Sequence, residues 1–209
     1  MNAPIAVQAD GLRMVFDRRV VFDGVRFVLA GMQTLLISGR NGAGKSTLVK
    51  IIAGVLTPTA GSVIVSGPGS DGIFGVQSLL GLVSPYLALY EEFSAEENLK
   101  HIAAIRGLQY DREVAHDLLR RVALLPRKDD PVRTYSSGMK QRAKYAAALL
   151  HRPPLLILDE PMSNLDTDGV AIVREVMAEH RREGLLIVAT NDLSDVDRFD
   201  ERVDLNALR

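Results

Sequence analysis

Three short runs of this 209-residue chain are almost entirely apolar, and they lie at Thr34–Ser38, Leu155–Leu158 and Leu185–Ala189. Each run is next to a segment of helical character. Continuously apolar runs of this length are typical of strands that are buried on both faces of a parallel sheet. The pattern therefore predicts an α/β core.

The N-terminal region carries a different pattern. From Ile5 to Leu29, β-branched and apolar residues are mixed with Arg and Asp, and turn residues interrupt the region at Asp17–Arg19 and Asp23–Gly24. This predicts short antiparallel strands joined by turns. A further short strand is predicted at Ser62–Ser66, followed by a turn-rich loop at Gly67–Gly72.

Apolar residues at helical spacing mark two further segments, Ala95–Arg106 and Arg112–Leu124, whose other faces are charged. A helix is also predicted at Lys45–Ala53, because Gly54 and then Pro58 follow it. We expect a helical lobe inserted between the glycine-rich loop that precedes Lys45 and the strands that follow Arg152. The expected organisation is one domain, 1–209, made of a β and glycine-loop part (1–75), a helical lobe (76–150) and the C-terminal part of the core (151–209).

Composition narrows the range of partners. The 25 Lys and Arg residues and 26 Asp and Glu residues leave a net charge of −1, so no strong field gathers nucleic-acid phosphates, and nucleic acid is not expected as a partner. The absence of Cys excludes disulfides and suits a reducing compartment. Met1–Asp10 lacks the pattern of a secretory signal, and no apolar stretch approaches the roughly 18 to 20 residues of a membrane span. We expect a cytoplasmic protein.

The segment Gly39–Ser46 fits the pattern G-x-x-x-x-G-K-[ST] at every fixed position, after a predicted strand and at the start of a predicted helix. Its backbone N–H groups can curl around a phosphate, Lys45 can reach the terminal phosphates, and the Ser46 hydroxyl can ligate Mg²⁺. The alternative, a turn that merely joins strand to helix, leaves Lys45 and Ser46 unexplained. The predicted nucleotide-binding residues here are Gly39, Arg40, Asn41, Gly42, Ala43, Gly44, Lys45, Ser46 and Thr47.

Two adjacent carboxylates, Asp159 and Glu160, end the apolar run that begins at Leu155. Open α/β sheets bind ligands at this carboxyl edge. Consecutive side chains diverge there, so we expect Asp159 to hold Mg²⁺ and Glu160 to orient and deprotonate an attacking water. The alternative is that both acids cap the following turn.

The segment Tyr135–Arg142 reads YSSGMKQR and opens a predicted helix that runs to Leu150. It resembles the signature motif of the ABC ATPases. Together with the phosphate loop, the acidic pair and Ser163–Asp166, it makes the chain similar to that family over nearly its whole length. The resemblance implies a P-loop core with a mainly parallel sheet, an N-terminal antiparallel β subdomain and an inserted helical subdomain.

The resemblance also implies a head-to-tail dimer that encloses two ATP molecules. Ser136, Ser137 and Gly138 would contact the ATP of the partner subunit, and a helix N-terminus is a suitable anion site. By the same resemblance Asp166 communicates across the dimer and Phe16 stacks on adenine, although an aromatic residue in an N-terminal strand is often a core residue.

At two positions the sequence departs from the family. Alignment from Glu97 places Pro85 where the family has a Gln that contacts metal and water, and proline offers no amide for that work. After the strand Leu185–Ala189, Asn191 stands in place of the usual His. Asn191 can donate a hydrogen bond to a γ-phosphate but cannot become a cation, so the expected catalytic residues are Glu160 and Asn191, with hydrolysis slowed or even abolished.

The leading interpretation is an ATP- and Mg²⁺-dependent hydrolase that energises a transporter. It would act at the cytoplasmic face of the membrane, where the segment from Ser84 to Phe93 would dock on a separate transmembrane subunit. Homodimer and heterodimer stay open. One alternative is an ATP-dependent switch with slow or no hydrolysis, or the weaker cassette of a heterodimer. Another is an ABC protein of DNA repair or translation, but this chain has neither the two cassettes nor the long coiled coils usual there. The spelling of the signature and the short chain resemble export-type ABC ATPases.

Overall fold

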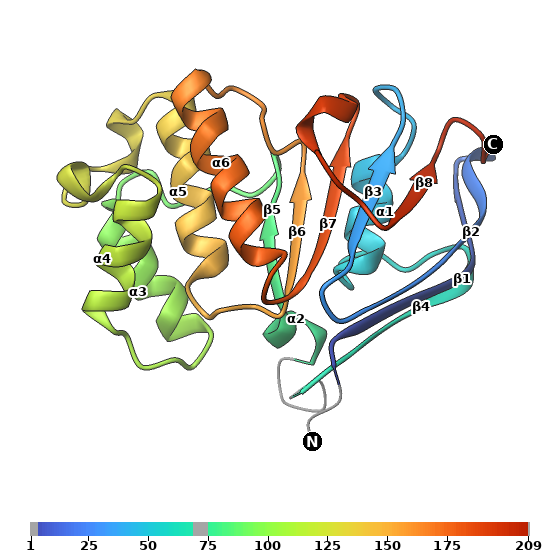
Figure 1. Ribbon diagram of the computed structural model, residues 1–209, viewed down its shortest axis with the longest axis horizontal. Coiled ribbons are helices and arrows are strands. Elements are labelled where there is room, and N and C mark those ends of the chain that lie inside the picture. Colours follow the sequence, from blue (N-terminus) through green and yellow to red (C-terminus); the bar gives the residue numbers. More distant parts are fainter. Residues whose placement is uncertain (1–3, 69–74, 209) are drawn as a thin grey trace.

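The computed structural model describes residues 4–68 and 75–208, so most of the predicted loop at 67–72 lies outside the described residues. A five-stranded parallel sheet with the order β5-β6-β7-β3-β8 forms the centre of the molecule (Figure 1). Its strands are β3 (Thr34–Ser38), β5 (Leu80–Val83), β6 (Leu155–Asp159), β7 (Leu185–Thr190) and β8 (Glu201–Asp204). The three apolar runs are therefore β3, β6 and β7, as predicted.

A second sheet is antiparallel and has the order β2-β1-β4, with β1 (Ala6–Phe16), β2 (Arg19–Ala30) and β4 (Ala60–Ser66). The prediction of antiparallel strands is confirmed, but the prediction of a turn at Asp23–Gly24 is wrong. These two residues lie inside β2, at a shift of register between the pairs Leu12–Val25 and Met14–Phe22. Such a bulge accommodates an extra residue and a glycine at φ 78° without ending the strand.

Six α-helices accompany the sheets in the described part of the chain, and α3 to α5 follow β5 and precede β6, as expected of an inserted helical lobe. Leu80–Val83, just before these helices, adds an edge strand to the parallel sheet. The helices are α1 (Lys45–Ile52), α2 (Val76–Leu79), α3 (Ala95–Ile105), α4 (Arg112–Arg121), α5 (Ser137–Leu149) and α6 (Thr167–His180); short 3₁₀ turns lie at Leu125–Arg127, Val132–Thr134 and Leu193–Asp195. None of the helices in the described ranges is long and apolar enough to cross a membrane.

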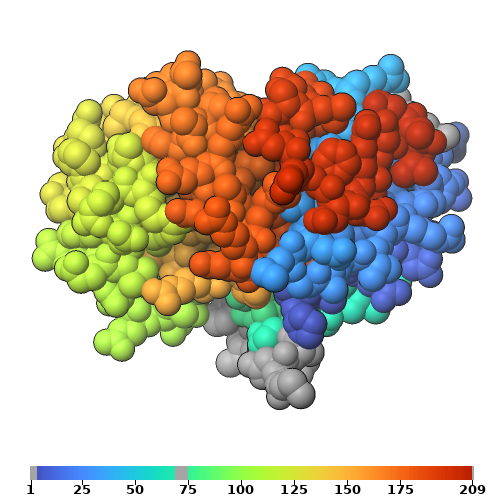
Figure 2. Space-filling model, viewed as in Figure 1, coloured from blue at the N-terminus to red at the C-terminus, as the bar shows by residue number. Residues whose placement is uncertain are grey.

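The parallel sheet divides the core into two apolar layers. Successive strand residues point to opposite faces, so Leu155 and Ile157 pack with α1 and the antiparallel sheet, whereas Leu156 and Leu158 pack with α3 to α6. In the space-filling view the N-terminal sheet and the helical lobe form the two ends of the molecule (Figure 2). Both layers anchor the carboxyl ends of β3, β6 and β7, where the candidate site lies.

Candidate nucleotide-binding site

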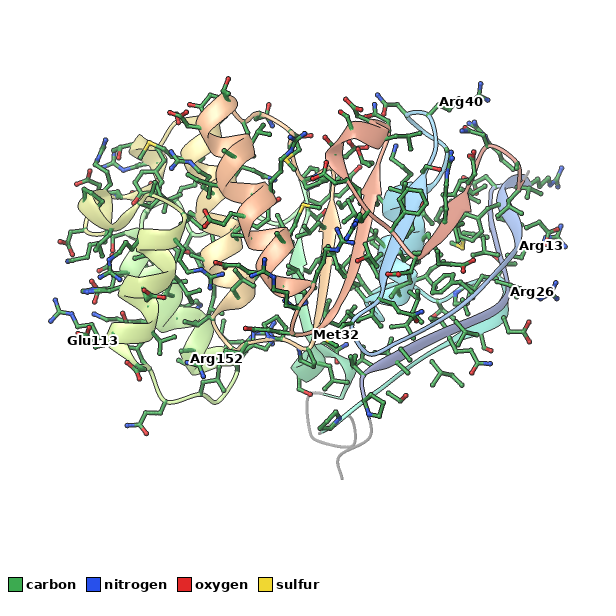
Figure 3. The ribbon with its side chains drawn as sticks, in the orientation of Figure 1. Arg13, Arg26, Met32, Arg40, Glu113 and Arg152 are labelled. Carbon is green, nitrogen blue, oxygen red and sulfur yellow. The ribbon has the colours of Figure 1, made fainter. Side chains whose placement is uncertain are left out.

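The loop between β3 and α1 is shaped by three glycines. Gly39, Gly42 and Gly44 have φ values of 157°, 77° and 104°, a region that L side chains rarely adopt. A Cβ on Gly44 would lie 2.4 Å from Cγ1 of Val21, so the loop is pressed against β2. Arg40 is exposed, and its side chain points away from the molecule (Figure 3), so only its backbone is available to a ligand in the site.

Lys45 opens α1 and is buried, with 5% of its side chain exposed. Its Nζ donates to the carbonyl oxygen of Gly39 at 2.9 Å and lies 3.1 Å from Oε1 of Glu160. The bond to Gly39 holds the ammonium group over the loop. The sequence motif and the acidic pair, which are distant in the chain, are thus directly joined by the ion pair of Lys45 and Glu160.

Asp159 ends β6 and is fully buried. Its Oδ2 accepts a hydrogen bond from the hydroxyl of Ser84 at 3.2 Å, and Ser46 also hydrogen-bonds to this carboxylate. Burial raises the pKa of Asp159, while the bonds from Ser46 and Ser84 oppose that rise. Oδ1 has no hydrogen-bond partner within the described ranges. A buried carboxylate oxygen without a partner, next to a hydroxyl, suits a hard cation such as Mg²⁺.

Glu160 follows directly and differs from Asp159 in both exposure and backbone. Its side chain is 23% exposed, and its φ is 51°, a left-handed conformation that is costly for a residue with a Cβ. Its N–H donates to the carbonyl of Ala189 on β7 at 2.8 Å. This backbone turns the Glu160 carboxylate away from the buried strand and into the cavity.

The cavity itself has a volume of about 710 Å³ and opens at the carboxyl edge of the sheet. Phe16, 46% exposed, lies at its rim on β1, which is compatible with contact to a planar base. Pro85 also lines it. The lining residues are Phe16, Arg19, Val20, Val21, Asn41, Gly42, Gly44, Lys45, Ser46, Thr47, Pro85, Tyr86, Glu160, Ser163 and Asn191.

Asn191 follows β7 and reaches the phosphate loop. Its Nδ2 donates to Oδ1 of Asn41 at 3.1 Å. The structure thus brings Asn191 into the cavity beside Glu160 and Lys45.

The signature residues do not line this cavity within the described residues. Ser136 is the N-cap of α5, and its hydroxyl accepts from the N–H of Met139 at 3.2 Å. Ser137 is exposed in the first turn, and Gly138 is half-buried. Asp166 is likewise a cap, because its Oδ1 accepts from the N–H of Gly169 at 2.8 Å at the start of α6.

Sequence reasoning missed Ser84. It directly follows β5, the neighbour of β6 in the sheet, and its hydroxyl is bonded to Asp159. One feature of the sequence could have indicated Ser84 as a site residue. It comes directly before Pro85, at the end of the strand that lies beside the acidic strand.

A glycine loop between strand and helix, beside a strand that ends in two acids, defines the P-loop class of nucleotide-binding domains. Residues 22–163 match the family model described as ABC transporter, and the chain belongs to this family as an ATP-binding subunit.

Two curated relatives cover most of this chain. The cytochrome c biogenesis ATP-binding export protein CcmA of Pseudomonas putida (strain GB-1) is 35% identical, over 88% of each chain. The lipoprotein-releasing system ATP-binding protein LolD 1 of Caulobacter vibrioides is 36% identical, over 89% of this chain and 86% of its own. The chain spans 60% of a third relative, the linearmycin resistance ATP-binding protein LnrL of Bacillus subtilis, which is 31% identical over 88% of this chain.

Solved structures show the same fold. A structure described as the ATP binding subunit of an ABC transporter superposes with a TM-score of 0.82 at 29% identity, over 95% of this chain and 85% of that one. A bacterial Atm1-family ABC exporter with ATP bound gives a TM-score of 0.83 at 22% identity and covers 96% of this chain, which spans 37% of that protein. The predicted α/β P-loop fold is confirmed.

Proposed function

We propose that this chain binds ATP with Mg²⁺ and hydrolyses it, and that it thereby drives an export-type ABC transporter. The observation that carries the proposal is the meeting of Lys45, Asp159 and Glu160 at one edge of the sheet, with Lys45 and Glu160 in a single cavity. These are the groups that phosphoryl transfer to water requires: a cation on the phosphates, a metal ligand and a base.

Each group has a defined task in this mechanism. The N–H groups of the loop and Lys45 would bind the β- and γ-phosphates. Asp159 and Ser46 would hold Mg²⁺, which would supply positive charge to the phosphate oxygens. The Glu160 carboxylate would accept a proton from the attacking water as the water oxygen bonds to the γ-phosphorus. The bond from that phosphorus to ADP breaks, so ADP and inorganic phosphate leave. Phe16 packs against the base at the rim. Asn191 can offer an amide donor to the γ-phosphate from the other side of the loop.

The exposed start of α5 supports a dimer. Ser137 and the α5 N–H groups do not line the chain's own cavity within the described residues, and a helix start with exposed N–H groups would suit an anion from another subunit. A Cβ on Gly138 would lie 3.2 Å from the carbonyl oxygen of Asn164, so the start of α5 packs close to the loop that leads to Asp166. Two copies placed head to tail, or this chain and a related cassette, would bring each α5 start onto the ATP of the other subunit.

A separate transmembrane subunit would complete the transporter. The names of the relatives describe an export protein and a releasing system, each with an ATP-binding component. In this chain the segment from Ser84 to Phe93 exposes Tyr86, Leu87, Tyr90 and Phe93, an apolar surface that suits docking on such a subunit at the cytoplasmic face of the membrane.

The test is Mg²⁺-dependent ATP hydrolysis by the purified chain at a series of protein concentrations. Glu160→Gln keeps the shape of the side chain and removes the base, so we expect ATP binding to persist and turnover to fall at least a hundredfold. Glu175→Gln, an exposed change on α6, is the matched control and should hydrolyse normally. A Glu160→Gln enzyme as fast as wild type would refute this assignment of the base.

A slow cassette or a nucleotide switch is the second candidate, and the bond between Asn191 and Asn41 favours it. That bond ties one of the two amide N–H donors of Asn191 to the loop, and Pro85 supplies no polar side chain. We expect Asn191→His to raise kcat by about tenfold, because a histidine can carry positive charge towards the γ-phosphate. An unchanged kcat would show that position 191 does not limit turnover.

A further inference from the structure

Tyr145 lies in the middle of α5 and is fully buried. Its phenol hydroxyl donates to the carbonyl oxygen of Pro161 at 2.9 Å. Pro161 is the residue after Glu160, and Tyr145 does not line the nucleotide cavity within the described part of the chain. The helix that carries the signature residues is therefore bonded directly to the backbone that carries the proposed base.

This backbone needs support. Glu160 is held at φ 51° and Asn164 at φ 61°, so two residues with a Cβ are left-handed within one short loop. Conformations of this kind persist only where the surrounding structure fixes them. On the side of β7 the support is the bond from the Glu160 N–H to Ala189.

On the other side, two bonds lie within the loop itself, from the Ser163 N–H to the Glu160 carbonyl and from the Leu165 N–H to the Met162 carbonyl, and Tyr145 adds a bond from the core. Proline has no N–H, so its carbonyl is the one backbone hydrogen-bonding group that Pro161 offers. Tyr145 occupies that group with a neutral donor, since burial raises the pKa of the phenol far above its usual range, helped by the charge of Asp195. The loop is thus fixed to β7 at Glu160 and to α5 at Pro161.

We propose that Tyr145 is a positioning residue for Glu160, whose hydroxyl holds the Pro161 carbonyl and so sets the direction of the Glu160 carboxylate. The proposal rests on the proposed function for its effect on catalysis. The structural part of the proposal is that the Tyr145 hydroxyl fixes the loop 160–165, and this part does not depend on hydrolysis.

The kinetic test is Tyr145→Phe, which keeps the ring in the core and removes one oxygen atom. We expect kcat for ATP to fall about tenfold or more, with KM and ATP affinity within twofold of wild type, because misplacement of a base slows the chemical step without removing ground-state contacts. Tyr110→Phe is the matched control: it removes a hydroxyl bonded to Glu96 at 3.2 Å in the same helical lobe, and kcat should not change.

A double variant separates positioning from a general loss of structure. If Tyr145 acts through Glu160, adding Tyr145→Phe to Glu160→Gln should not lower the residual turnover further. Independent tenfold losses that multiply in the double variant would overturn the proposal.

Amide hydrogen exchange tests the same bond when no turnover is measured. Tyr145→Phe should speed exchange in a peptide covering 160–165 by more than tenfold relative to other peptides, and Tyr110→Phe should not. Unchanged exchange in that peptide would overturn the proposal. Faster exchange in a chain whose wild type fails to hydrolyse ATP would instead refute the proposed hydrolysis and support the positioning role.

Discussion

Gly44 is constrained both by its backbone conformation and by the close approach of β2. Its φ of 104° excludes most side chains, and the nearest atom to a Cβ would be a methyl carbon of Val21 on β2 at 2.4 Å. Val21 is held within the antiparallel sheet, so it cannot retreat without moving β2. The glycine therefore sets the distance between the phosphate loop and the sheet that carries Phe16.

Gly44→Ala should weaken ATP binding strongly while the chain still folds. The added methyl group must push the loop out of its curl, and we expect affinity to fall at least a hundredfold, measured by titration with a fluorescent ATP analogue. Gly31→Ala is the control, because Gly31 also has a positive φ of 65° but nothing lies within 4 Å of the added carbon. It should cost about 1 to 2 kcal/mol of folding free energy and leave binding intact. Normal binding by Gly44→Ala would show that the loop tolerates displacement.

Some residues of the site can be predicted from the sequence and others cannot. Lys45, Asp159 and Glu160 belong to short motifs whose spacing follows from the chemistry of a phosphate and a metal ion. Ser84 and Tyr145 belong to no such motif: their partners are 75 and 16 residues away, and serine and tyrosine are common in all kinds of environment. Such contacts depend on which strands and helices become neighbours, which the local pattern does not specify.

Among the elements, α3 and α4 are joined through one buried carboxylate. Glu96 is 5% exposed and lies in the first turn of α3. Burial alone would raise its pKa, but hydrogen bonds from His116 and Lys128 and nearby cations lower it to about 2. The groups around it are Lys100 at 3.5 Å, Tyr110 at 3.2 Å, Arg112 at 3.7 Å, His116 at 3.1 Å and Lys128 at 3.3 Å.

The stability that this cluster contributes should depend on pH. Because the folded pKa is about 2 and the ordinary value is 4.5, the contribution is complete above pH 4.5 and is lost as the pH falls towards 2. Glu96→Gln should therefore lower the free energy of unfolding by about 3 kcal/mol at pH 7, and by less than half of that at pH 3. Urea unfolding at both pH values measures this. Glu92→Gln is the control, because the side chain of Glu92 is 81% exposed, and it should change the free energy of unfolding by less than about 1 kcal/mol. If Glu96→Gln lost the same free energy of unfolding at both pH values, the lowered pKa of Glu96 would not be the source of its contribution.

The elements themselves were predictable where periodicity was strong. Helices α3 and α5 end within one residue of the predicted positions, whereas α4 ends at Arg121 because Val122 caps it and Ala123 turns left-handed at φ 53°. Strand β8 has no sequence signal of its own: ERVD is mostly polar, and it is a strand because β3 offers an open edge.

In the whole molecule, the cavity and the exposed start of α5 are separate surfaces, so a dimer can be tested without disturbing ATP binding. An aspartate in the first helical turn interacts favourably with the helix dipole, but it repels a phosphate. Ser137→Asp should therefore leave the stability of the monomer and the ATP affinity of the monomer unchanged, and it should abolish ATP-induced dimers in sedimentation experiments on the Glu160→Gln background. Dimers that persist with Ser137→Asp would argue against contact between α5 and the partner's ATP.

The strand order also governs how the chain assembles as it is synthesised. Strand β3, which carries the phosphate loop, pairs in the described structure with β7 and β8 alone, and β7 begins only at Leu185. The hairpin of β1 and β2 can form early because its strands are neighbours in sequence, but β3 stays without a partner until the rest of the core has left the ribosome. An apolar strand with open edges is prone to wrong pairing during that interval. The ATP site is thus among the last parts of the molecule to become complete, and a chain whose synthesis stops before Leu185 contains the phosphate-loop motif but lacks both strands that pair with β3 in the described structure.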